Sequence, residues 1–162
     1  MRRTLLISML LIFIGAVLSF MLADRRPPHE YVDADIIPDK VMPGEPMTLV
    51  FVVLRRRDCP GITRRFLTLS NGDIYIYDAV PAAVGSQITY GQDALKSNSD
   101  GGKVGHIIRE FYLPKDRDDR KVPRGTTTYN AEVHYYCNFL QQVLRFPIVV
   151  RPPSLTFEII DP

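Results

Sequence analysis

The stretch Thr126–Cys137, TTTYNAEVHYYC, alternates between two kinds of side chain. One face carries the mostly apolar residues Tyr129, Ala131, Val133, Tyr135 and Cys137, and the other carries Asn130, Glu132, His134 and Tyr136. A period of two residues is that of a β-strand, and one apolar face is typical of a half-buried strand in an antiparallel sheet. This stretch therefore predicts a sheet that covers a core on one side.

A second stretch, Met47–Leu54, MTLVFVVL, is apolar on both faces and predicts a central strand. Further strands are expected at Tyr31–Ile37, Ile62–Ser70, Ile74–Tyr77, Val84–Tyr90, Val104–Leu113, Leu144–Val150 and Leu155–Ile160. The Asn71-Gly72 pair is a hairpin signal, and Ser97–Gly102 and Lys115–Lys121 are expected loops. In the latter loop, the carboxylates of Asp116, Asp118 and Asp119 are expected to form solvated ion pairs with neighbouring arginines. Seven to nine short strands between prolines and glycines predict an all-β antiparallel sandwich.

Ahead of these strands lies Thr4–Ala23, TLLISMLLIFIGAVLSFMLA, a run without a charged residue. A helix of about 20 residues spans about 30 Å, the thickness of the bilayer hydrocarbon. The run therefore predicts a transmembrane signal-anchor helix. A cleaved signal peptide is the alternative, but its apolar core usually has only about 7–15 residues, and cleavage after Ala23 places bulky Met21 where a small residue is preferred. A buried globular helix fits poorly, because the run is apolar on every face.

The orientation is not decided by the arginines, because Arg2 and Arg3 are matched by Arg25 and Arg26. The short tail before the helix and the long domain after it favour an N-terminus in the cytoplasm. We therefore expect a single-pass protein of a bacterial inner membrane with its C-terminal domain on the periplasmic side. The expected segments are a tail at 1–3, the helix at 4–23, a linker at 24–30 and the domain at 31–162.

Charge and motifs narrow the classes of function. The formal net charge is +2, and two of these charges are Arg2 and Arg3, so the remainder lacks the positive excess of general nucleic-acid binders. The sequence contains no G-x-S-x-G, S-x-x-K, CxxC or HxxxH motif, and no His follows Cys137 as a copper site requires. We expect no catalytic, cofactor or metal residues, no enzymatic activity and no nucleic-acid partner. A hydrolase with dispersed residues is the least favoured alternative.

The segment Tyr135-Tyr136-Cys137 resembles the tyrosine corner of immunoglobulin-like domains, in which a tyrosine lies two residues before a cysteine. The segment 43–59, PGEPMTLVFVVLRRRDC, resembles an early strand that leads to the partner cysteine. The resemblance covers about residues 31–160 and is to a bacterial or phage type of immunoglobulin-like β-sandwich, not to a named family. Two departures are the absence of tryptophan and the position of Cys59 beyond the end of its strand.

Cys59 and Cys137 are the only cysteines, and they are a reactive or metal-binding pair or a structural disulfide. An immunoglobulin-like strand order places both at the membrane-proximal end of the domain, which favours the disulfide in an oxidising compartment. The same end is expected to hold a basic patch of Arg55, Arg56, Arg57, Arg64 and Arg65. Two interpretations stay open for the patch: contact with anionic headgroups, worth about 1 kcal/mol per residue, or a solvated strand end that discourages edge pairing.

Together these features predict a membrane-anchored β-sandwich that acts as an interaction module. It would contact lipid through residues 4–23 and serve a protein partner as an accessory or scaffolding subunit of a cell-envelope complex. The alternative is a secreted binding or adhesion domain released by signal peptidase.

Overall fold

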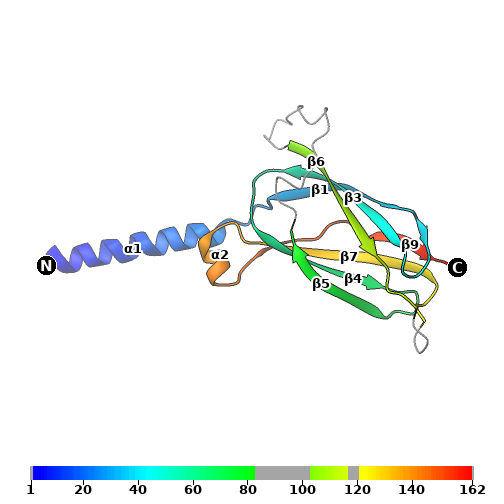
Figure 1. Ribbon diagram of the computed structural model, residues 1–162. Coiled ribbons are helices and arrows are strands. Elements are labelled where there is room, and N and C mark those ends of the chain that lie inside the picture. Colours follow the sequence, from blue (N-terminus) through cyan, green and yellow to red (C-terminus); the bar gives the residue numbers. More distant parts are fainter. Residues whose placement is uncertain (1, 83–102, 117–120, 162) are drawn as a thin grey trace.

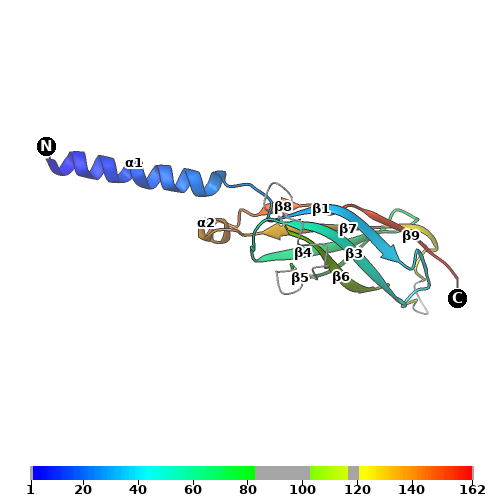
Figure 2. The ribbon, with the colours of Figure 1, turned by 90° about the horizontal axis from the view of Figure 1, so that it is seen from above.

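A computed structural model of the protein describes residues 2–82, 103–116 and 121–161. The chain begins with a long helix, α1 (Arg2–Ala23), and continues into a domain built almost entirely of strands. Figures 1 and 2 show α1 leaving this domain at the end where the short helix α2 (Phe139–Val143) lies, opposite the C-terminus. Within the described part of the chain, the architecture is thus one projecting helix and one β-rich domain.

The first sheet has the strand order β1-β3-β6 and is antiparallel throughout. Its strands are β1 (His29–Ile37), β3 (Pro46–Arg55) and β6 (Lys103–Tyr112). The central position predicted for Met47–Leu54 is confirmed, because β3 pairs with β1 over Thr48–Arg55 and with β6 over its whole length. One face of β3 is buried, and the other, with Val50 and Val52, is half-buried.

The second sheet has the strand order β2-β9-β7-β4-β5, and β8 pairs separately with β7. Its strands are β2 (Lys40–Val41), β4 (Gly61–Thr68), β5 (Ile74–Pro81), β7 (Gly125–Tyr135), β8 (Ile148–Val150) and β9 (Leu155–Ile159). All of its pairings are antiparallel except that of β2 with β9. The hairpin predicted at Asn71-Gly72 is present between β4 and β5, and Gly72 adopts the positive φ of 88° that glycine tolerates best.

The two sheets share one apolar core. Leu49, Phe51 and Phe111 from the first sheet meet Leu67, Tyr129 and Phe157 from the second. The alternation predicted for β7 is confirmed, since Tyr129, Ala131, Val133 and Tyr135 are all buried. The prediction of an all-β antiparallel fold is therefore correct.

Three local features differ from the sequence prediction. The predicted turn at 138–142 is the helix α2, which Asn138 caps by accepting a 3.0 Å hydrogen bond from the Gln141 amide. Because α2 extends to Val143, the strand expected over Leu144–Val150 is shortened to β8. β1 begins at His29, inside the expected linker at 24–30.

Some predictions fall outside the described residues. They are the strand at Val84–Tyr90, the loop at Ser97–Gly102 and most of the charged loop at Lys115–Lys121, including Asp118 and Asp119. Among the residues that are described, no helix combines the length and the apolarity that crossing a membrane requires. This finding does not support the transmembrane helix expected at 4–23.

Candidate functional site at the junction of helix and sheets

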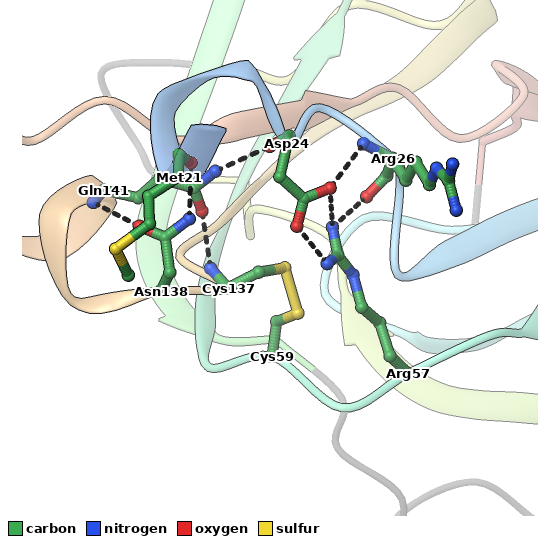
Figure 3. A network of polar contacts seen from close by, with 8 residues as sticks. All are labelled: Met21, Asp24, Arg26, Arg57, Cys59, Cys137, Asn138 and Gln141. Carbon is green, nitrogen blue, oxygen red and sulfur yellow. Dashed lines mark hydrogen bonds and ion pairs between the residues drawn. A yellow bond between two sulfur atoms is a disulfide. The ribbon is translucent and has the colours of Figure 1, made fainter. Parts of the chain in front are cut away.

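The junction between α1 and the sheets contains an ion pair between residues far apart in the sequence. Asp24 follows α1 directly, and Arg57 follows the end of β3. Two guanidinium nitrogens of Arg57 bind the two carboxylate oxygens of Asp24, and Nη2 also donates to the Arg26 carbonyl (Figure 3). The hydrogen bonds from Arg57 hold the pKa of the Asp24 carboxyl below its ordinary value. Both side chains are half-buried, so solvent screens this pair only in part.

Two side-chain amides, that of the α2 N-cap Asn138 and that of Gln141 within α2, bind carbonyl groups at the end of α1. Asn138 Nδ2 donates to the Met21 carbonyl at 2.9 Å, and Gln141 Nε2 donates to the Asp24 carbonyl at 2.9 Å. The last four carbonyls of a helix have no partner inside the helix, and buried polar groups without partners are costly. The domain therefore caps α1 with its own side chains.

The same amide of Gln141 connects this cap to the disulfide. Gln141 Oε1 accepts a 2.7 Å hydrogen bond from the Cys137 amide, and the Gln141 side chain is fully buried. Cys137 is bonded to Cys59, which confirms the predicted disulfide. Figure 3 shows the disulfide lying beside the Asp24–Arg57 pair, so three segments of the chain, 21–26, 57–59 and 137–141, meet at this junction.

The structure separates the five arginines of the predicted basic patch. Arg55, Arg56 and Arg57 lie near the junction and pair with Asp58, Glu30 and Asp24, respectively. Arg64 and Arg65 lie in the middle of β4, opposite Glu132 and Ala131 of β7. Arg65 donates to the Asp78 carbonyl at 3.1 Å and lies over the Tyr77 ring. Contact of these five residues with lipid stays a prediction.

His29 is a residue of the junction end that the sequence did not single out. Its side chain is fully buried, and Nδ1 lies 3.0 Å from the hydroxyl of Tyr135. Burial, followed by the charge of Arg55, lowers the pKa of His29 to about 4. The imidazole is therefore neutral at physiological pH.

Asp24, Asn138 and Gln141 are three further junction residues that were not expected from the sequence. The pattern Asn138-x-x-Gln141 is a helix-start signal that was available in the sequence. No such signal exists for Asp24 with Arg57, because only the fold brings them together. Among the described residues, no group of three or more His, Cys, Asp or Glu side chains is arranged to hold a metal ion.

No protein-family model matches the sequence, and no curated protein matches it either. Among solved structures, the chain is similar to the Pseudomonas fluorescens alkylpurine DNA glycosylase AlkC bound to DNA containing an abasic site analog, with 17% identity and a TM-score of 0.46. That match covers 89% of this chain but only 33% of the glycosylase chain. A CARDB domain from Pyrococcus furiosus, solved in complex with di-metal ions, matches at 12% identity and a TM-score of 0.36, covering 83% of this chain and 91% of that chain.

These matches require two corrections. The sequence analysis excluded enzymatic activity and a nucleic-acid partner, yet a structure similar to this chain is an enzyme bound to DNA. We therefore withdraw both exclusions. The similarity is too low to transfer the glycosylase activity or the DNA to this chain, which spans about a third of the glycosylase.

Proposed function

We propose that this chain is a single-pass membrane protein that displays an immunoglobulin-like β-sandwich as an interaction module outside the bacterial cytoplasm. It would serve as an accessory or scaffolding subunit of a cell-envelope complex. The observation that carries this proposal is the junction, where the sheets hold the end of α1 through the Asp24–Arg57 pair and the amides of Asn138 and Gln141.

The apolar surface of α1 supports a lipid environment. The helix has 22 residues, which corresponds to about 33 Å. Its described apolar side chains face solvent on all sides, namely Leu6, Ile7, Met9, Leu10, Leu11, Ile12, Phe13, Ile14, Val17, Leu18 and Phe20. Side chains of α1 are described for residues 6–21 and 23, so this exposed surface covers most of the uncharged run Thr4–Ala23. Each buried CH₂ group contributes about 0.8 kcal/mol, so transfer of this surface to lipid is strongly favourable.

The junction favours a retained helix over a cleaved leader. Cleavage after Ala23 would remove Met21 and leave the Asn138 amide without its carbonyl partner. It would also place a charged amino group on Asp24, inside the site where Arg57 and Gln141 bind. A leader destined for removal has no need of these contacts with the mature domain. The disulfide supports an extracytoplasmic domain, since such bonds persist in oxidising compartments.

The immunoglobulin-like assignment is supported by the strand order of the two sheets and by Tyr135, which is buried two residues before Cys137. Two features depart from the antibody pattern. Within the described part of the chain the Tyr135 hydroxyl binds the side chain of His29, and the disulfide lies at one end of the sheets. The assignment is to an architecture, which hosts many functions.

The strand β5 supports an interaction role. Among the described residues it pairs only with β4, so no described strand covers its outer edge. Its apolar residues Ile74, Tyr75 and Ile76 are exposed, and Ile76 is 77% exposed. Exposed apolar groups on an edge strand are suited to adding a strand from a protein partner.

The intact mass of the chain isolated from membranes tests the anchor and the compartment. Free thiols are trapped first, and no reductant is used. We expect the full-length mass without label on Cys59 or Cys137. A mass lacking residues 1–23 would favour the secreted alternative, and labelled cysteines would place the domain in a reducing compartment.

Crosslinking in intact cells tests the interaction role. A photoreactive residue replaces Ile76 on β5, and the matched control carries it at Val32 on β1, which is also exposed. We expect a discrete adduct with one envelope protein from position 76 and none from position 32. The same adducts from both positions, or none from either, would contradict the use of β5.

A further inference from the structure

A cluster of exposed apolar side chains lies on and just after α2, beside the end of α1. Its members are Phe139, Val143, Leu144 and Phe146, which are 70%, 58%, 57% and 47% exposed. Phe139 and Val143 are four residues apart, so they share one face of the helix. The junction contacts bury the opposite face through Gln141. We call these four residues the α2 cluster.

We infer that the α2 cluster is a second membrane-contact site, which inserts into the headgroup region of the bilayer next to the point where α1 leaves it. This inference rests on the proposed function, because it requires α1 to span the membrane. We assign lipid as the partner of the α2 cluster because the cluster lies at the same depth as the end of α1.

That depth is fixed by two hydrogen bonds. Asn138, the residue before Phe139, donates to the Met21 carbonyl in the last turn of α1, and Gln141 donates to the Asp24 carbonyl. When residues 4–23 span the hydrocarbon, Met21 and Asp24 lie at its boundary. Asn138 and Gln141 bind the carbonyl groups of Met21 and Asp24, so they lie at the same depth in the membrane. An amphipathic segment in this position buries its apolar side chains about 5–10 Å into the boundary between headgroups and acyl chains.

The charges around the cluster fit an anionic lipid surface. Arg25, Arg26 and Arg145 are exposed at this level. Arg25 stacks on the Phe146 ring, with its guanidinium carbon 3.7 Å from the ring centroid, and donates to the Pro147 carbonyl at 2.9 Å. Apolar side chains flanked by arginines are typical of segments that lie in the membrane interface.

The end of α2 also keeps an arginine at a backbone position that favours glycine. Arg145 has a positive φ of 51°. The Arg145 amide donates to the Gln142 carbonyl and the Phe146 amide to the Gln141 carbonyl, which is the Schellman arrangement that ends helices. Glycine at this position would relieve the backbone but remove a cation from the surface that faces the headgroups.

A single tryptophan tests the inference, because the natural chain has none. The full chain is reconstituted in vesicles that contain phosphatidylglycerol and phosphatidylcholine brominated either near the headgroup or deep in the acyl chains. Phe139→Trp reports on the α2 cluster, and Phe13→Trp reports on the middle of α1. Ile74→Trp is the matched control, since Ile74 is 62% exposed at the opposite end of the domain. Val143→Trp replaces Phe139→Trp if the latter does not fold.

We expect Phe139→Trp to lose on the order of half its emission to the shallow bromines and less to the deep ones, as an interfacial depth requires. Phe13→Trp is expected to be quenched most by the deep bromines, and Ile74→Trp by neither. If Phe13→Trp is quenched but Phe139→Trp is quenched no more than Ile74→Trp, the inference is overturned and the anchor stays intact. A blue-shifted but unquenched Phe139→Trp would assign the cluster to a protein contact. An unquenched Phe13→Trp would overturn the anchor and the inference with it.

Discussion

The two ends of the sheet domain are held by different kinds of contact. At the end beside α1, a disulfide, a fully buried glutamine and a half-buried ion pair join three segments of the chain. At the opposite end, Arg124 bridges Asp116 at 2.6 Å and Asp161 at 3.0 Å. The carboxylate of Asp161 there is 83% exposed. One end thus holds a disulfide and a fully buried glutamine besides its ion pair, whereas the other is held by the two ion pairs of Arg124, one of them with an exposed carboxylate.

This difference shows where the domain is built to resist opening. Exposed ion pairs contribute about 0–1 kcal/mol each, whereas a disulfide contributes about 2–4 kcal/mol. Local opening starts where few buried groups must be exposed, so it is expected first at the Arg124 end. The end that is attached to α1 then keeps the domain at a fixed position relative to the helix. Four predictions test this comparison.

The largest expected effect comes from the disulfide. Replacement of both Cys59 and Cys137 by alanine frees a loop of 78 residues in the unfolded chain. We expect the free energy of unfolding to fall by about 4 kcal/mol, because the bond restricts the unfolded state. Urea unfolding of the full chain in detergent micelles measures this, with the reduced natural chain as the control. A loss below about 1 kcal/mol would mean that the disulfide stabilises its end of the domain no more than an ion pair stabilises the other end.

The second prediction concerns pH and His29. The pKa of His29 is about 4 in the folded protein, below the ordinary 6.5, so the unfolded chain binds more protons between these values. The stabilising contribution is therefore complete above pH 6.5 and is lost as the pH falls toward 4. We expect a loss of up to about 3 kcal/mol over this range.

His29→Gln should flatten the dependence of the unfolding free energy on pH between 6.5 and 4. His106→Gln is the matched control, because His106 lies on β6 and not at the junction. Unfolding by urea at several pH values measures both. An unchanged slope in the His29 variant would show that another group carries the pH dependence.

The third prediction concerns Gln141, whose amide binds the Cys137 N–H and the Asp24 carbonyl. Gln141→Ala removes the partner of both half-buried backbone groups. We expect a loss of about 2 kcal/mol, within the range of 1–3 kcal/mol for an unsatisfied buried group. Gln142→Ala is the matched control, since Gln142 is the next residue and is exposed. Equal losses in the two variants would contradict a role for the Gln141 contacts in the junction.

The sequence predicted those parts of the fold that depend on local pattern. The alternation from Thr126 to Cys137 gave β7 and its buried face, because a strand places alternate side chains on opposite faces whatever its neighbours are. The apolar run Met47–Leu54 gave a central strand for a similar reason. The disulfide was also predicted, since only two cysteines are present and strand direction places them at one end.

The junction was harder to predict, because most of its contacts join residues that are distant in sequence. Asp24 and Arg57 are 33 positions apart, and Gln141 binds a carbonyl 117 positions away. The helix α2 has only five residues, too few for an apolar period, so the Asn138-x-x-Gln141 cap was its one local signal, and the segment was predicted as a turn. Arg55, Arg56 and Arg57 were predicted as part of a basic patch, and their ion pairs were not foreseen. Asp58, the partner of Arg55, is only three residues away, but the fold brings Glu30 to Arg56 and Asp24 to Arg57.

The smallest expected effect belongs to the far end, and it is best measured against the junction. Asp161→Asn removes one of the two carboxylates that Arg124 binds, and Asp116 keeps the other contact. We expect a loss below about 1 kcal/mol that decreases further in high salt, because an exposed pair is screened. Asp24→Asn is the counterpart at the junction. Its loss should be larger and should depend less on salt, since Asp24 and Arg57 are half-buried. Equal losses with equal salt dependence would show that both ends are held by solvated ion pairs and that the stiffness of the junction comes from the disulfide and Gln141 alone.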